Sequence, residues 1–296
     1  MEDLILGIET VMDNPRLIIM WIISFSLLYF GIFKKKEPLL LVPISMGLFF
    51  ANLPLSEFVR LEKEGHPAGL LITFQKIGME SDIFPLLIFL GVGASTDFGP
   101  MLRNPKTLLL GAGAQMGVFI SLLGALFLGY FKIFDFGLLE ASSIGIIGGA
   151  DGPTTIFIST RMRELGESLS GVEVMDIVGA TAIAAYSYMA LVPIIQPPLI
   201  KLFTTKKERR IKMNQLVQDT PYYVKIIFPI LSILIISILV PSASTLIGML
   251  MLGNLIKVSG VVPRLADVSE NSLMNVTIIF LGLAVGSTMP AEVFLK

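Results

Sequence analysis

The stretch GIIGGADGPTT, residues 145–155, decides how the chain is organised. It gathers glycines and Pro153 inside an apolar run that reads SSIGII before the break and TTIFIS after it. Glycine is costly in a helix and proline lacks the amide donor, so we predict a broken helix. Backbone without helical hydrogen bonds persists at membrane depth only inside protein or beside a wet cavity. We therefore expect the break to be shielded from lipid; a water-exposed loop between spans is the alternative.

The composition of the whole chain is that of a membrane protein. Of the 296 residues, 54% are hydrophobic and 15% are charged, and mean hydropathy is +0.81, whereas soluble domains carry about 25% charged residues. The chain has no cysteine, which excludes disulfides, thiolate catalysis and cysteine-based metal sites. Its one histidine, His66, lies in the polar stretch SEFVRLEKEGHPAG, where we expect an exposed loop.

Apolar segments recur along the chain at the length a membrane span requires, about 20 residues. They predict an all-α polytopic membrane protein with eight or nine embedded segments, preceded by a short N-terminal interfacial helix. Glycines are expected to interrupt the third and the last of these segments. The expected segments are residues 17–33, 39–53, 83–98, 108–131, 141–159, 177–195, 224–240, 241–255 and 276–289.

Two clusters of basic residues give the orientation. One follows the first span at residues 34–36, and the other is KLFTTKKERRIK at residues 201–212. Because cytoplasmic loops are enriched in Lys and Arg, we expect both on the cytoplasmic side of the inner membrane. The second cluster has no interleaved aromatic residues, so it is a solvated linker or a docking face for a cytoplasmic partner rather than a nucleic-acid site.

The chain also repeats itself. LLIFLGVGAST at residues 86–96 matches IIFLGLAVGST at 278–288, and MGLFFAN and MLGNL precede them. Such a pattern is typical of a repeat-built transporter with broken or re-entrant helices. The predicted organisation is an interfacial helix and first span (1–37), a first repeat (38–197), a basic cytoplasmic linker (198–222) and the start of a second repeat (223–296). Because the broken segment begins about 60 residues after IFLG in the first repeat, its counterpart is expected near position ~340, two or three spans beyond this sequence.

Asp151 lies in the predicted break. A carboxylate at membrane depth costs ~2.5 kcal/mol or more, so it marks function rather than packing. Together with the hydroxyls of Thr154 and Thr155 and the backbone at Gly149 and Gly152, it offers hard oxygen ligands. One carboxylate balances one positive charge, which favours Na⁺ or a proton. An anion site at a helix N-terminus is disfavoured by the negative side chain.

Three further polar side chains are weaker candidates. Asp97 ends an apolar segment and could ligate Na⁺, although capping of the next helix at the membrane interface explains it equally well. Tyr186 and Tyr188 fall inside an apolar segment, where a phenol can pack at the interface or relay a proton. The string GVGAST lacks the lysine of a phosphate-binding loop, so the chain contains no motif for transport driven by ATP.

IGIIGGADGPT resembles a motif of the beta subunits of the sodium-pumping biotin-dependent decarboxylases, which act on oxaloacetate, methylmalonyl-CoA or glutaconyl-CoA. LGVGASTDFGPMLRNPKTLLLGAGAQ before it and AAYSYMALVPIIQPP after it extend the resemblance, which runs from about Pro38 to the end of the sequence.

The resemblance implies a function. A carboxyltransferase subunit would load biotin on a carrier domain, and this subunit would decarboxylate carboxybiotin and export Na⁺ with consumption of a proton. Asp151 would be the ion-binding residue and Tyr188 would lie on the proton and ion path. The fold would move like an elevator, and the subunit would form a trimer with a small membrane subunit.

Two points remain open at this stage. The family's second broken segment, which carries Asn and Ser, is not found in these residues, so half of the ion site is expected elsewhere. The alternative function is a sodium-coupled secondary carboxylate transporter without biotin chemistry, which would share the broken segments and the repeat.

Overall fold

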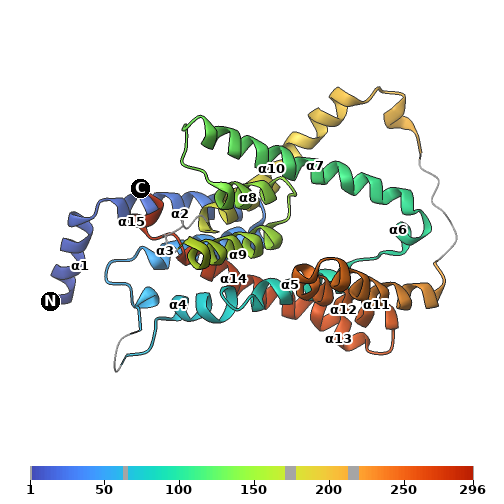
Figure 1. The fold of residues 1–296 in the computed structure, drawn as a ribbon. Coiled ribbons are helices and arrows are strands. Elements are labelled where there is room, and N and C mark those ends of the chain that lie inside the picture. The colour runs from blue at the N-terminus through green and yellow to red at the C-terminus, as the bar shows by residue number, and fades with distance from the viewer. Residues whose placement is uncertain (1, 63–65, 171–177, 213–219, 296) are drawn as a thin grey trace.

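The computed structural model describes residues 2–62, 66–170, 178–212 and 220–295, and this part of the chain is built from helices (Figure 1). Single turns of 3₁₀-helix and two short π-helices, η2 (Gln75–Met79) and η6 (Val268–Leu273), join the α-helices. The α-helices are α1 (Glu2–Asp13), α2 (Arg16–Ile32), α3 (Pro38–Ala51), α4 (Leu70–Phe74), α5 (Ile83–Ser95), α6 (Gly99–Arg103), α7 (Leu108–Tyr130), α8 (Leu138–Ile147), α9 (Gly152–Ser170), α10 (Val178–Phe203), α11 (Tyr222–Leu239), α12 (Ser244–Ser259), α13 (Pro263–Asp267), α14 (Met274–Ser287) and α15 (Ala291–Phe294).

Helix length and apolarity confirm a polytopic membrane protein but not the expected number of segments. In the described ranges, four helices are long and apolar enough to cross a membrane, or six if each bent pair forms one span. The count of eight or nine is not confirmed because α3, α8 and part of α10 are apolar but short. The four long helices are Pro105–Tyr130, Tyr222–Leu239, Pro241–Ser259 and Pro263–Ser287.

Two sharp bends shape the N-terminal half. The first lies between α1 and α2, whose axes (Leu6–Asp13 and Arg16–Ile32) differ by 89°. This is the arrangement that an interfacial helix before a span requires. The second bend, 61°, separates Leu70–Met79 from α5. The expected segment 83–98 therefore has a preceding half-span that the sequence did not reveal.

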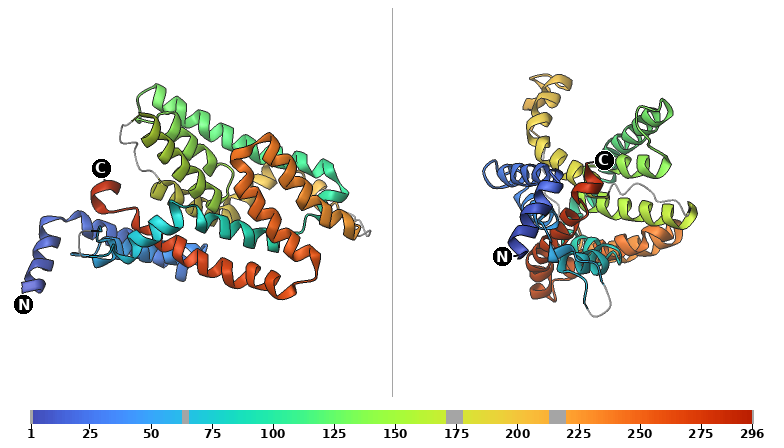
Figure 2. Two further views of the ribbon diagram at one scale, coloured as in Figure 1. Left: turned by 60° about the horizontal axis from the view of Figure 1, so that its bottom comes forward. Right: turned by 90° about the vertical axis from the view of Figure 1, so that its left-hand side faces the viewer.

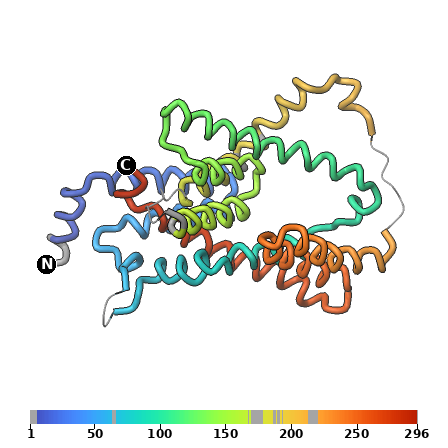
Figure 3. The backbone as a smooth tube through the Cα atoms, in the orientation of Figure 1, coloured from blue at the N-terminus to red at the C-terminus, as the bar shows by residue number. Residues whose placement is uncertain are grey.

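Helices distant in the sequence form the core: α3 packs along α14, and α5 packs along α12 (Figures 1 and 2). The buried cluster includes Met20, Ile44, Leu48, Leu281 and Val285, each fully enclosed. The C-terminal α15 returns to α2, where Asn14 Nδ2 donates to Glu292 Oε1 at 3.2 Å (Figure 3). The C-terminal end of the described chain thus lies beside the junction of α1 and α2.

Glycines allow α5 and α12 to approach closely. A Cβ at Gly93 would lie 1.8 Å from the carbonyl oxygen of Leu250, and one at Gly253 would lie 1.9 Å from that of Leu90. Both distances are far inside van der Waals contact, so only glycine fits. Small residues at helix interfaces in membranes serve this purpose.

The same arrangement occurs between α3 and α14. A Cβ at Gly286 would lie 2.1 Å from the carbonyl oxygen of Ile44, and one at Gly47 would lie 2.3 Å from that of Leu283. The two helix pairs share one spacing. In each helix, the carbonyl oxygen that faces the partner's glycine belongs to the residue three positions before that helix's own glycine. The internal repeat in the sequence therefore corresponds to two equivalent helix crossings in the structure.

These crossings correct one prediction. The glycines were expected to interrupt segments 83–98 and 276–289, but α5 and α14 run through them without a break. Tertiary packing outweighs the low helix propensity of glycine here, because the missing side chain is what lets the helices touch.

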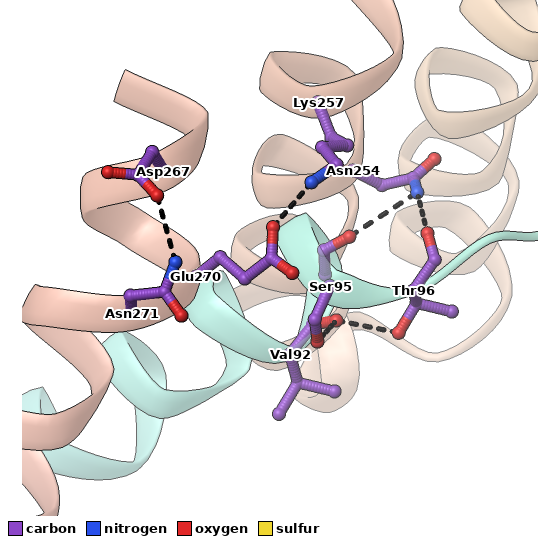
Figure 4. A network of polar contacts seen from close by, with 9 residues as sticks. Val92, Ser95, Thr96, Asn254, Lys257, Asp267, Glu270 and Asn271 are labelled. Atoms are coloured by element: carbon purple, nitrogen blue, oxygen red, sulfur yellow. Dashed lines mark hydrogen bonds and ion pairs between the residues drawn. The ribbon is translucent and has the colours of Figure 1, made fainter. Parts of the chain in front are cut away.

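Polar side chains complete the contact between α5 and α12 (Figure 4). Asn254 Nδ2 donates to the carbonyl oxygens of Gly93, at 3.3 Å, and Thr96, at 2.8 Å, where α5 ends. Lys257 pairs with Glu270 of η6 at the same end of α12. The buried amide thereby pairs the carbonyl oxygen of Thr96 and adds a second donor at that of Gly93, which also accepts from the amide of Thr96 at 3.3 Å.

Candidate functional site

The broken segment forms a tight turn between α8 and α9. The amides of Gly148, Gly149 and Ala150 donate to the carbonyl oxygens three residues earlier, at 2.9–3.0 Å. Ala150 then takes a left-handed conformation with φ of 53°, which ends α8 and redirects the chain into α9. A non-glycine residue in this region costs ~1 kcal/mol or more, so the turn is held by its surroundings.

Helix α7 supplies part of that support. A Cβ at Gly148 would lie 2.4 Å from the carbonyl oxygen of Gly117, and one at Gly117 would lie 2.7 Å from that of Gly148. The two backbones therefore touch, and α7 packs along α8 as a whole. This contact fixes the end of α8 and the start of the break.

Asp151 is the residue immediately before α9. Its carbonyl oxygen accepts hydrogen bonds from the amide of Thr155, at 3.0 Å, and from the hydroxyl of Thr155, at 2.7 Å. Its Oδ2 accepts from the hydroxyl of Thr154 at 2.5 Å. Asp151 thus occupies the N-cap position of α9, where the helix dipole favours a negative charge.

Three carbonyl oxygens just before Asp151 in the chain accept no hydrogen bond from the described residues, and one of them, at Gly148, faces the backbone of α7 at Gly117. These are the carbonyl oxygens of Gly148, Gly149 and Ala150. Gly152, also predicted as a ligand, is the first residue of α9. The described ranges hold no group of three or more His, Cys, Asp or Glu side chains that could bind a metal ion. An ion at Asp151 would therefore meet one carboxylate and neutral oxygens, a donor set suited to a monovalent cation.

The expected shielding of the break is not provided by the residues that the structure describes. Ala150 and Asp151 are exposed, and Gly148 and Gly149 are half-buried. On the far side of the turn the chain is well packed, because Thr155 and Ile156 of α9 are fully enclosed. Asp151 is therefore open on one side in the described chain, and its shielding from lipid stays a prediction.

The other predicted residues lie apart from this turn. Tyr188 is 41% exposed on α10 and lines an apolar groove with Val192, Gln196 and other residues of that helix. The side chain of Tyr186 lies outside the described residues. Asp97 Oδ1 accepts from the amide of Gly99 at 2.9 Å, an Asx turn at the start of α6. No hydrogen bond in the described chain joins Asp97 or Tyr188 to Asp151.

Sequence reasoning missed one polar contact beside the site. Asp82, at the bend before α5, pairs with Arg161 of α9. The available signal was weak: an aspartate and, three residues later, Pro85 are typical of a helix start, but nothing in the sequence pairs Asp82 with an arginine 79 residues away.

Comparison with known proteins identifies the family. Residues 16–296 match the family model described as the Na⁺-transporting oxaloacetate decarboxylase beta subunit. The chain belongs to this family. It is 50% identical over 277 residues to the glutaconyl-CoA decarboxylase beta subunit of Acidaminococcus fermentans, an alignment that covers 94% of this chain and 67% of the relative.

Two other relatives carry different substrate names. The methylmalonyl-CoA decarboxylase beta subunit of Veillonella parvula is 47% identical over 303 residues, which cover all of this chain and 74% of the relative. The oxaloacetate decarboxylase beta chain of Klebsiella pneumoniae is 43% identical over 327 residues, which cover 94% of this chain and 73% of the relative. The chain is therefore a multi-pass membrane protein of the sodium-transporting decarboxylase beta subunits, and its similarity spans all three named substrates.

Proposed function

We propose that this chain is the membrane subunit that decarboxylates carboxybiotin and couples the reaction to Na⁺ export, with Asp151 as its ion-binding carboxylate. The observation that carries the proposal is the geometry at the break. Asp151 immediately precedes α9, the hydroxyl of Thr154 donates to its carboxylate at 2.5 Å, and the carbonyl oxygens just before it are unpaired in the described chain. This is the donor set of a Na⁺ site that is open on one side.

Na⁺ is the cargo and carboxybiotin is the reactant. In the reaction, the bond between the carboxyl carbon and the biotin nitrogen breaks, CO₂ leaves, and the nitrogen takes a proton. We propose that Na⁺ and this proton compete for the negative charge at Asp151, because one carboxylate balances only one of them. The coupling requires that Na⁺ binding and access of carboxybiotin both shift one equilibrium between two conformations of the subunit. CO₂ release then drives the outward release of Na⁺.

Several parts of the complete machine are proposed to lie outside this chain. The biotin carrier and the carboxyltransferase are soluble partners, and the acyl substrate is recognised by them rather than here. A small membrane subunit and a homotrimer of this subunit complete the membrane part. Tyr188 is proposed to lie on the proton path, and its half-exposed phenol on α10 is accessible to another element.

A charge-neutral substitution tests the role of Asp151. In the complete complex, Asp151→Asn should abolish Na⁺-stimulated decarboxylation of carboxybiotin while leaving carboxyl transfer onto biotin intact, since the amide cannot balance a cation. The measurement is the release of CO₂ from pre-carboxylated biotin carrier as Na⁺ is raised. A normal Na⁺ response in this variant would contradict the role of Asp151 as the Na⁺-binding residue.

A further inference from the structure

Asp82 is a buried acidic residue that the proposed ion site does not use. It is 4% exposed, the one charged residue that is buried among the described side chains. It lies where the chain bends by 61° between Leu70–Met79 and α5, and it takes a left-handed conformation with φ of 59°. A charge in such a place needs a partner, because burial of an unpaired carboxylate is strongly unfavourable.

Arg161 of α9 is that partner. Its guanidinium pairs with Asp82 Oδ2, donates to Glu164 Oε2 at 2.9 Å, and lies 5.7 Å from the centre of the Phe157 ring. The second oxygen of Asp82, Oδ1, is buried and has no hydrogen-bond partner in the described chain. Among the described residues Arg161 is the cation paired with Asp82, and its loss would leave that charge without this partner.

Helix α9 connects this ion pair to the ion site. Asp151 is attached to the first turn of α9 through two hydrogen bonds from Thr155 to its carbonyl oxygen. Arg161 lies nine residues after Gly152, about 14 Å along the same helix at 1.5 Å per residue. A movement of Arg161 relative to the bend at Asp82 would thus be transmitted to Asp151.

We infer that Asp82 and Arg161 are a positioning pair that holds α9, and with it the Asp151 carboxylate, against the bent span before α5. Neither side chain touches the ion. Their ion pair sets where the carboxylate lies and therefore how tightly Na⁺ binds. This inference rests on the proposed function, because it takes Asp151 as the Na⁺ ligand.

The test separates ion affinity from turnover in the complete complex. Asp82→Asn and Arg161→Gln should each raise the Na⁺ concentration for half-maximal decarboxylation about tenfold, with maximal rates changed much less. Arg161→Lys should fall between these variants and the parent. Because the two residues act as one unit, the double variant should be no worse than either single variant. Glu164→Gln removes the charge of the half-buried second partner of Arg161 and is the matched control, with parent-like Na⁺ dependence.

A second variant tests the inference if the single variants prevent assembly of the complex. Asp82→Cys/Arg161→Cys introduces two thiols into a sequence of 296 residues that has no cysteine. Bridging them with a short bis-thiosulfonate reagent should restore a low Na⁺ requirement that the unbridged form lacks. Parent-like Na⁺ dependence in the single variants, or no effect of bridging, would overturn the inference. If Asp151→Asn keeps its Na⁺ response, the proposed function fails instead.

Discussion

At the scale of single residues, the hydroxyl of Thr154 donates a hydrogen bond to the Asp151 carboxylate at 2.5 Å. Thr154→Val keeps the size of the side chain and removes the hydroxyl, so the carboxylate loses both a hydrogen bond and a neighbouring ligand oxygen. If the lost ligand oxygen contributes about 1.4 kcal/mol to ion binding, the Na⁺ requirement rises about tenfold.

Thr154→Ser is the matched control for this prediction, because it keeps the hydroxyl and loses only a methyl group. Titration of decarboxylation with Na⁺ should give a parent-like curve for Thr154→Ser and a shifted one for Thr154→Val. Identical curves for the two variants would remove Thr154 from the site.

Ala150 provides a test of the turn itself. Its φ of 53° lies in the region that glycine adopts freely, and alanine pays about 1 kcal/mol there. Ala150→Gly should therefore stabilise the subunit by up to about 1 kcal/mol, and Ala150→Val should destabilise it, because β-branched residues are rarely left-handed. Thermal unfolding of the purified complex measures both, and a Val variant as stable as the parent would contradict the left-handed turn.

At the scale of elements, the equivalent helix crossings explain which glycines matter. Gly93 in α5 and Gly286 in α14 would place a Cβ 1.8 and 2.1 Å from a backbone carbonyl oxygen of α12 and α3. Gly248 in α12 has open space instead. Backbone cannot move aside as a flexible side chain can, so the first two positions tolerate no substitution.

Alanine substitutions test this account. Gly93→Ala and Gly286→Ala should each destabilise the subunit by ~2 kcal/mol or more, at the upper end of overpacking costs. Gly248→Ala should be neutral or stabilising by up to about 1 kcal/mol, since alanine is the better helix former. Expression and thermal stability of the three variants give the comparison. Equal thermal stability of Gly93→Ala and Gly248→Ala would contradict the close approach of α5 and α12 at Gly93.

The same elements show what sequence alone could predict. The break at GGADGP was predictable because glycine and proline act locally, and α8 and α9 do separate there. The effect of Gly91 and Gly93 was predicted wrongly, because it depends on segments distant in the sequence: η6 and α14 at Gly91, and α12 at Gly93. The half-span Leu70–Met79 was missed since it is short and carries Gln75 and Lys76.

At the scale of the whole molecule, composition was sufficient for a multi-pass membrane protein, but burial was not predictable. In the most apolar 18 residues of α7 and of α11, only 6% are buried within this chain, so lipid or other subunits must cover these helices. Asp151 is exposed for a related reason. The described residues leave its carboxylate uncovered, and burial of a side chain depends on contacts that local sequence does not specify.

The central claim is that decarboxylation of carboxybiotin drives Na⁺ across the membrane through Asp151. Uptake of radioactive Na⁺ into vesicles that contain the complete complex tests it most directly, with and without avidin, in the parent and in Asp151→Asn. We predict substrate-driven uptake in the parent, loss of uptake when avidin captures the biotin, and no uptake in Asp151→Asn. Uptake that avidin does not affect would instead indicate a secondary carboxylate transporter and would contradict the account.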